Sequence, residues 1–303
     1  MVQNVEKFKG VFVAFYACYD DNGNVSEEKI RTLTNWYIEK GVNGLYLTGS
    51  SGEGMMLSVE ERMQTVKAVM EVAKGRTTVI VHVGAPNTAD SCKLAAQAAA
   101  VGADAISSGP NMYSGLPENG IEAYWDAMID AAKLPFFIYN FPSATGYDIS
   151  MSLFEKMIKK PYVAGIKTCS TDCQLILRMK RIGGENTIIF NGEDPQLLAG
   201  LCMGATGGIG GTYGAMPELY VNLYRAYLEG DMKKALLWQD RAEKAFMHAR
   251  VKWSHGIASL KAILNARGMD CGGVRAPFTF VPADTPEVVE AAEMIENWVK
   301  EGY

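Results

Sequence analysis

The chain has 303 residues, and 48% of them are hydrophobic, which is enough apolar content for one large core. Its formal net charge is −5, and no block of basic residues occurs. This balance argues against nucleic acid or an anionic membrane surface as a partner. No run of about 18 apolar residues is present, so the sequence predicts no membrane span.

The six cysteines and three histidines are scattered along the chain. No C-x-x-C pattern occurs, and a chain of this size is not typical of a disulfide scaffold, so the cysteines suit a reducing cytosol. The first ten residues, MVQNVEKFKG, contain no apolar signal region. We therefore expect a cytoplasmic protein without disulfides. The histidines lie too far apart in the sequence to indicate a metal site, so we expect no metal.

Short apolar segments alternate with helical segments along most of the chain. The sequence predicts eight strands, at residues 11–14, 44–48, 78–83, 104–107, 135–140, 163–167, 187–190 and 205–211. The first predicted helix covers 26–40, and the second begins with the capping box 58–61. The later ones cover 87–102, 118–132, 150–157, 172–181 and 195–203.

Eight strands, each followed by a helix at near-even spacing, predict a (β/α)8 TIM barrel. A doubly wound open sheet is the alternative, and the missing glycine fingerprint after the first strand disfavours it. After residue 217 only helices are predicted, at 219–228, 233–250, 254–266 and 286–298. We expect the barrel to cover residues 1–229 and a C-terminal helical appendage to cover 230–303.

The segment VAGIKTCS, residues 163–170, has the pattern of a buried strand that ends on Lys167. Burial disfavours the ammonium form, lowers the pKa and leaves a neutral amine that can attack a carbonyl carbon. The alternative is a lysine whose stem packs on apolar surface while its amine reaches solvent.

Polar side chains also stand at the ends of two other predicted strands. Tyr139 ends the fifth strand, and Ser50 and Ser51 follow the second. Since the chemistry of such barrels lies at the carboxyl ends of the strands, Tyr139 and Lys167 should face the same mouth. A phenol can move protons while the amine forms a carbinolamine, and the GSSG turn offers hydroxyl and N–H groups to a carboxylate. The set predicts a Schiff base with a 2-oxo acid.

The same features also have explanations that involve no function. Tyr139 could be a core tyrosine, and GSSG could be only a turn. The glycine-rich segment 207–211 fits either close backbone packing or a phosphate cradle, although it lacks the full phosphate-loop spacing.

Taken together, these residues resemble the pyruvate-dependent class I aldolase family that includes N-acetylneuraminate lyase and dihydrodipicolinate synthase. The resemblance covers nearly the whole chain. Its segments, in order, are GLYLTGSSGE at 44–53, YNFPSATG at 139–146, GIKTCS at 165–170, FNGED at 190–194 and GGIGGTY at 207–213.

The resemblance implies a catalytic role for Lys167, which would attack C2 of pyruvate or of a keto acid. Tyr139 would relay protons, Ser50 and Ser51 would bind the carboxylate, and the backbone near Ile209 would line the pyruvate end. It further implies small-molecule substrates, no cofactor other than the covalent Schiff base, and a homotetramer.

A tyrosine from the fourth βα loop assists at the site in this family. Tyr113 is the corresponding candidate here.

The sequence is closer to the lyase than to the synthase. The synthase has an arginine for its dicarboxylic substrate in the segment where this chain has Ala144. The lyase pattern G-x-D-E, which holds the sugar hydroxyls, is here Gly192, Glu193, Asp194 and Pro195.

Two further positions depart from the lyase pattern, with Gly211 in place of a serine and Cys169 in place of a threonine. An unpaired buried hydroxyl costs about 1–3 kcal/mol, so these changes can redirect specificity.

The leading hypothesis is a lyase that splits sialic acid or a related sugar acid into pyruvate and an aldehyde. The alternatives are the condensing synthase, a non-catalytic keto-acid-binding homologue and a phosphate-binding barrel enzyme.

Overall fold

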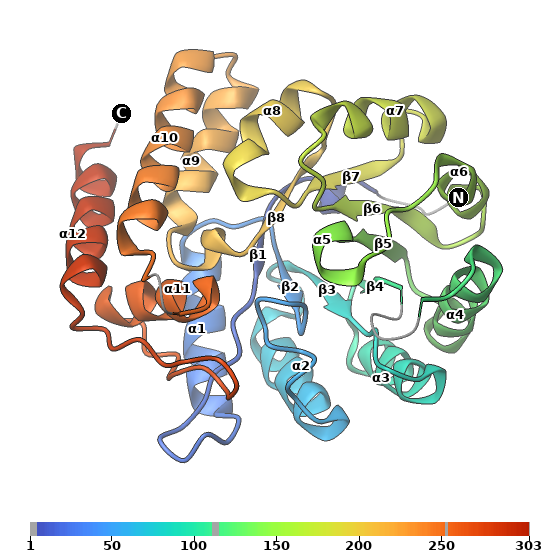
Figure 1. Ribbon diagram of the computed structural model, residues 1–303, viewed down its shortest axis with the longest axis horizontal. Helices are drawn as coiled ribbons and strands as arrows, with labels where there is room; N and C mark the ends of the chain where they lie inside the picture. The colour runs from blue at the N-terminus through green and yellow to red at the C-terminus, as the bar shows by residue number, and fades with distance from the viewer. Residues whose placement is uncertain (1–4, 111–114, 252–253, 303) are drawn as a thin grey trace.

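The computed structural model describes residues 5–110, 115–251 and 254–302. Eight parallel strands, paired in sequence order, close into a barrel, as predicted (Figure 1). The strands are β1 Gly10–Ala14, β2 Gly44–Leu47, β3 Thr78–His82, β4 Ala105–Ser108, β5 Phe136–Asn140, β6 Val163–Thr168, β7 Ile188–Asn191 and β8 Gly207–Gly210.

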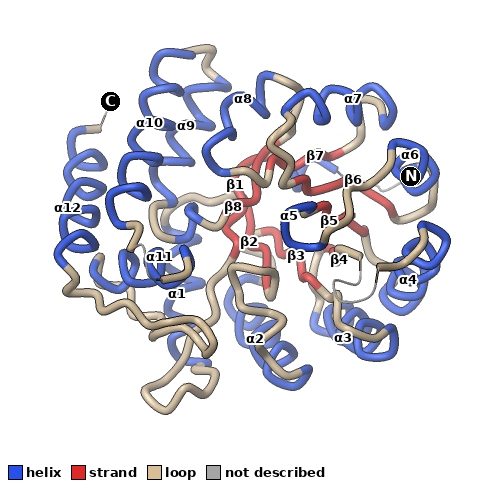
Figure 2. Tube along the Cα trace, in the orientation of Figure 1, coloured by secondary structure: helices blue, strands red, loops and turns tan. Residues whose placement is uncertain are grey.

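Helices surround this barrel on its outside (Figure 2). They are α1 Glu27–Glu39, α2 Val59–Ala73, α3 Thr88–Val101, α4 Glu118–Ala132, α6 Met151–Ile158, α7 Cys173–Gly183, α8 Leu197–Cys202 and α9 Pro217–Leu228. Side chains cap the first two of these helices, the second through the predicted capping box. Ser26 Oγ accepts a hydrogen bond from the backbone of Lys29 at 3.4 Å, and Ser58 and Glu61 form the reciprocal capping box that starts α2.

Three further helices follow the barrel, namely α10 Met232–Ala249, α11 Gly256–Ala266 and α12 Pro286–Glu301. Figure 1 shows α10 beside α9 on one side of the barrel, with α12 outside α10 and α11 below it. The domain boundary at residue 229 stays a prediction. Among the described helices, none combines the length and apolar character needed to cross a bilayer.

Three short helical turns that the sequence did not predict adjoin strands, namely η1 Val5–Phe8, α5 Pro142–Thr145 and η3 Thr212–Gly214. The predicted helix 195–203 is divided into η2 Asp194–Gln196 and α8. Proline at its first position and Gly146 at its C-cap, with φ of 68°, delimit α5. The predicted last strand, 205–211, is shorter because Gly211 already has helical backbone angles and leads into η3.

The core has two layers. Large apolar side chains fill the barrel interior, where the ring of Phe8 from η1 packs edge-on against Phe137 with centroids 5.0 Å apart. A larger cluster lies between the strands and the surrounding helices. The glycines of β8 are needed for close packing, since a Cβ on Gly207 would come within 2.0 Å of the carbonyl oxygen of Gly10. This explains the glycine-rich segment as backbone packing.

Candidate active site

Lys167 on β6 lies directly beside Tyr139 on β5 in the strand register, at the carboxyl end of the barrel. The Nζ atom of Lys167 lies 4.4 Å from the centre of the Tyr139 ring and 4.8 Å from the centre of the Tyr46 ring. The lysine is buried, with 5% of its surface exposed, and no ion pair to it is found in the described part of the chain. Desolvation by burial lowers the pKa of Lys167, as predicted for a strand-end nucleophile.

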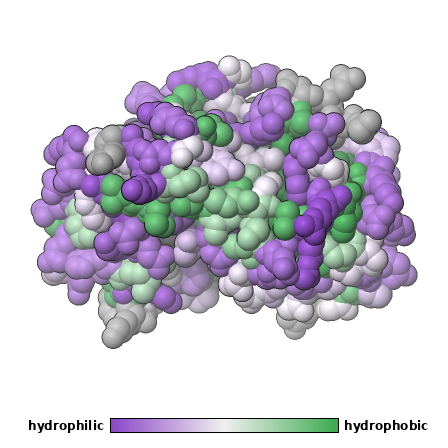
Figure 3. All heavy atoms as spheres, turned by 90° about the horizontal axis from the view of Figure 1, so that it is seen from above, coloured by the Kyte–Doolittle hydropathy of each residue, from purple (hydrophilic) through white to green (hydrophobic). Residues whose placement is uncertain are grey.

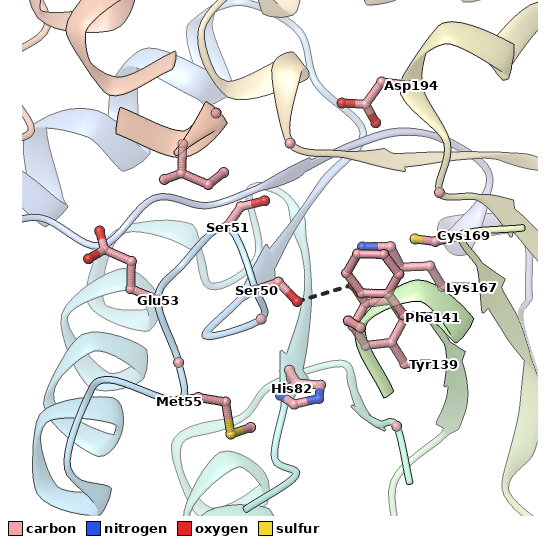
Figure 4. A pocket seen from close by; sticks show the side chains of 18 of the residues that line it. Ser50, Ser51, Glu53, Met55, His82, Tyr139, Phe141, Lys167, Cys169 and Asp194 are labelled. Carbon is pink, nitrogen blue, oxygen red and sulfur yellow. Dashed lines mark hydrogen bonds between the residues drawn. The ribbon is translucent and has the colours of Figure 1, made fainter. Parts of the chain in front are cut away.

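Tyr139 connects this lysine to the loop after β2. Its hydroxyl lies 3.3 Å from Oγ of Ser50 (Figure 4). Burial raises the pKa of Tyr139 well above its ordinary value, so the phenol holds its proton at neutral pH. A protonated phenol beside an amine whose pKa is lowered by burial can donate to an oxygen that forms on a carbon attacked by that amine.

Two further aromatic side chains, which the sequence analysis did not single out for the site, surround the pair. Tyr46 on β2 donates a hydrogen bond to Ser107 Oγ at 3.1 Å. The ring of His82 on β3 is edge-on to that of Tyr139, with centroids 5.8 Å apart. Burial, with help from the charges of Arg62 and Lys167, lowers the pKa of His82 to about 3, so its imidazole is neutral. No sequence signal separates Tyr46 or His82 from an ordinary buried residue of a strand.

The side chains stand around a cavity of about 820 Å³. In Figure 4, Ser50, Ser51, Glu53 and Met55 lie on one side of it, whereas the lysine, Phe141, Cys169 and Asp194 lie on the other. Most of the predicted site residues line this cavity, namely Ser50, Ser51, Tyr139, Lys167, Gly192, Glu193, Asp194 and Gly211.

The prediction for Ile209 concerns the backbone near this residue and not its side chain. The side chain of Ile209 is fully buried in the barrel interior, and Gly211 and Thr212 form the cavity wall beyond the same strand. Tyr113 lies outside the described residues.

Thr212 holds the carboxylate of Asp194 in place. Its Oδ2 accepts hydrogen bonds from the backbone N–H and from the hydroxyl of Thr212, both at 2.7 Å. Desolvation by burial nevertheless raises the pKa of Asp194. The neighbouring Glu193 has its pKa raised by burial and by the charge of Asp194, and its carboxylate makes no hydrogen bond within the described chain.

Cys169 and Gly192 pack next to the lysine. A Cβ on Gly192 would come within 2.4 Å of the Cys169 sulfur and 3.2 Å of Cε of Lys167, so glycine is required at this contact. Burial raises the pKa of the Cys169 thiol to about 11, which keeps it neutral and far from a reactive thiolate.

The C-terminal helical part supplies the remaining wall, which the sequence analysis did not predict. Phe246, His255, Ile257 and Phe278 all line the cavity. The rings of His255 and Phe278 are stacked with centroids 4.1 Å apart. The described residues include no group of three or more histidine, cysteine, aspartate or glutamate side chains that could hold a metal ion.

This barrel, with a buried lysine and a tyrosine at the mouth, has counterparts among known proteins. Residues 7–295 match the dihydrodipicolinate synthetase family, and the chain belongs to that family. Its fold also overlays that of the Ruminococcus gnavus sialic acid aldolase catalytic lysine mutant with a TM-score of 0.96, at 43% identity and 99% coverage of both chains.

Two curated relatives define its place within the family. An N-acetylneuraminate lyase of Mediterraneibacter gnavus is 43% identical over 297 residues, which cover 97% of this chain and 94% of the relative. A 4-hydroxy-tetrahydrodipicolinate synthase of Phenylobacterium zucineum is 33% identical over 272 residues, covering 90% and 92%. These values confirm the preference for the lyase over the synthase.

Proposed function

We propose that the protein is a pyruvate-dependent class I lyase that reversibly cleaves N-acetylneuraminate or a related sugar acid to pyruvate and an aldehyde. The observation that carries this proposal is the buried amine of Lys167, 4.4 Å from the centre of the Tyr139 ring, in a cavity that also contains both serines. The similarity to N-acetylneuraminate lyases supports the choice of substrate.

In the proposed reaction, the neutral amine of Lys167 attacks C2 of the keto acid, and the resulting carbinolamine loses water to give a protonated imine. The C4 hydroxyl then loses its proton, the C3–C4 bond breaks, and its electron pair moves to the imine nitrogen. The products of this step are an aldehyde and an enamine on the lysine. A proton added at C3 and hydrolysis by water release pyruvate and restore the amine.

Tyr139 is proposed to carry the protons in these steps. The hydroxyls of Ser50 and Ser51 are proposed to hold the substrate carboxylate, with the backbone near Ile209 at the pyruvate end. Gly211 is proposed to stand at a sugar-facing position. Tyr113 remains a candidate for assistance from the fourth loop. These assignments rest on the position of each residue in the motif of the family.

The sugar end of the cavity is proposed to bind hydroxyl groups through Asp194, Glu193 and the backbone of Gly192. Of the described lining residues, Lys167 is the one lysine or arginine. Ala144 lines the cavity in the segment where the synthase has an arginine. An aldehyde that carries its own carboxylate would therefore lack a cation, which favours the sugar acid.

We also propose a cytoplasmic homotetramer. The six cysteines are free, which is compatible with a reducing compartment. Large apolar side chains are exposed at Met203, Leu228, Met232 and Leu236, and Figure 3 shows an apolar area surrounded by hydrophilic surface on the face that it presents. Analytical ultracentrifugation tests the assembly.

The test of function is pyruvate release from N-acetylneuraminate and other keto sugar acids, compared with condensation of pyruvate and aspartate semialdehyde. We expect release from a sugar acid by the native protein and none by Lys167→Ala. Condensation with the semialdehyde alone would favour the synthase. Pyruvate binding without turnover of any substrate would favour the non-catalytic homologue.

A further inference from the structure

Glu53 lies in the loop after β2, which also carries Ser50 and Ser51, and its side chain is fully buried against the C-terminal helical part. Its Oε1 accepts a hydrogen bond from Nζ of Lys261 on α11 at 3.1 Å, and 1% of the lysine side chain is exposed. Its Oε2 accepts from the hydroxyl of Tyr19 at 3.3 Å and from the backbone N–H of Arg275 at 2.7 Å.

Lys261 extends the connection to the loop after β1, since it also donates to the carbonyl oxygen of Ala17 at 2.7 Å. One carboxylate thus joins three distant parts of the chain at the rim of the barrel. Figure 4 shows Glu53 beyond Ser50 and Ser51 as seen from Lys167. Although Glu53 is among the residues that line the cavity, its side chain is 0% exposed, and its carboxylate contacts other parts of the chain.

Stability alone is a poor explanation for this ion pair. Desolvation of two buried charges offsets most of their attraction, and a well-packed apolar pair is often as stable. Glu53 also has a left-handed backbone with φ of 52°, a conformation that is unfavourable for a non-glycine residue. The contacts of its side chain hold the loop in a conformation that the local sequence does not favour.

The loop is wound so closely that a shift of Glu53 would move the serines. The backbone N–H of Glu53 donates to the carbonyl oxygen of Ser50 at 3.1 Å. A Cβ on Gly54 would lie 2.0 Å from the carbonyl oxygen of Thr48, and one on Gly52 would lie 2.8 Å from that of Phe15. Ser50, at the other end of this turn, meets the hydroxyl of Tyr139.

We propose that Glu53 is a positioning residue, which sets the place of Ser50 and Ser51 and is itself set by Lys261 and the backbone of Arg275. Through Glu53, the C-terminal helical part then determines the geometry of the pyruvate site. The proposal rests on the proposed function, because it assumes that the two serines bind the substrate carboxylate.

The experiment measures the pyruvate concentration that gives half-maximal borohydride-trapped adduct on Lys167, together with the melting temperature. Glu53→Gln should raise this concentration about tenfold, because the neutral amide leaves the loop free to shift. Tyr19→Phe removes one hydrogen bond and keeps the ring that lies under both cations, so its increase should be about two- to fivefold.

Glu218→Gln is the matched control. Glu218 on α9 pairs with Arg267 at the end of α11 at 2.9 Å, and their side chains are 10% and 1% exposed. This substitution breaks a second buried ion pair to the same helix, and Glu218 does not contact the loop that carries the serines. The control should lower the melting temperature and leave the half-maximal concentration of pyruvate unchanged.

Folded Glu53→Gln and Tyr19→Phe proteins with the native pyruvate dependence would overturn the positioning role and leave the proposed function intact. If Glu53→Gln does not fold, Tyr19→Phe decides alone. If the native protein forms no adduct, the proposed function fails, and the positioning role fails with it.

Discussion

Lys167 and Tyr139 are register partners on adjacent strands, and the amine lies 4.4 Å from the centre of the phenol ring. This distance places the group that attacks a carbonyl close to the group that can protonate the resulting oxygen.

The first prediction tests the phenol. Tyr139→Phe keeps the ring under the amine and removes the hydroxyl, so kcat should fall about 10²- to 10⁴-fold while the protein stays folded.

Steady-state kinetics and circular dichroism check this prediction. Ser50→Ala is the comparison, because it removes the hydroxyl partner of Tyr139 and leaves the phenol in place. A Tyr139→Phe protein that retains native kcat would contradict the proton-relay role.

The second prediction concerns pH. Burial lowers the pKa of Lys167 from its ordinary value of 10.5, so the reactive neutral amine appears at a lower pH than in a free lysine. The rate of adduct formation at limiting pyruvate should rise with pH and reach its midpoint below 10.5. A stopped-flow or quench series across pH measures it, and a midpoint at or above the ordinary value would argue against a desolvated amine.

The same shift has a consequence for stability. The unfolded chain binds the proton of Lys167 more tightly than the folded chain, so the burial cost is present at neutral pH and disappears as pH rises towards 10.5. Lys167→Met should therefore melt at a higher temperature than the native protein at pH 7, and the gain should shrink at alkaline pH. A gain independent of pH would point to packing instead of charge.

The fourth prediction separates stability from sugar binding at Asp194. Burial raises the pKa of this carboxyl, so its ionised form costs stability at neutral pH, and the cost is lost as pH falls. Asp194→Asn keeps an acceptor for the backbone N–H of Thr212 and should not lower the melting temperature at pH 7. Its KM for the sugar acid should rise about 10- to 100-fold, while half-saturation by pyruvate stays near the native value. Equal changes in both constants would place Asp194 at the pyruvate end.

The fifth prediction concerns Glu193, whose carboxylate is without a hydrogen bond in the described chain and lines the cavity next to Pro195. If Glu193 holds sugar hydroxyls in place of an acid at 195, Glu193→Gln should raise the KM for the sugar acid about tenfold. Pro195→Glu in that background should recover part of the loss. An unchanged KM in Glu193→Gln would exclude this residue from specificity.

The sequence was sufficient for the barrel and for the central pair. Regular spacing of apolar segments predicts the strands, and adjacent strands of a parallel barrel must bring Tyr139 and Lys167 to one mouth. Tyr46 and His82 could not be predicted as neighbours of the lysine, because aromatic side chains in strands are most often core residues.

Contacts between distant segments were also beyond sequence reasoning. Lys261 meets Glu53 across 208 residues, and helix periodicity shows that Lys261 lies in a helix without showing that its amine is buried. Phe246 and Phe278 form cavity wall because of how the C-terminal part packs on the barrel, which no local pattern encodes.

The measurement that tests the account most directly is reduction with sodium borohydride in the presence of pyruvate, followed by peptide mapping. A pyruvyl adduct on Lys167, absent in Lys167→Ala and without borohydride, is the predicted result. A folded native protein that gives no adduct, or an adduct on another lysine, would contradict the Schiff-base mechanism.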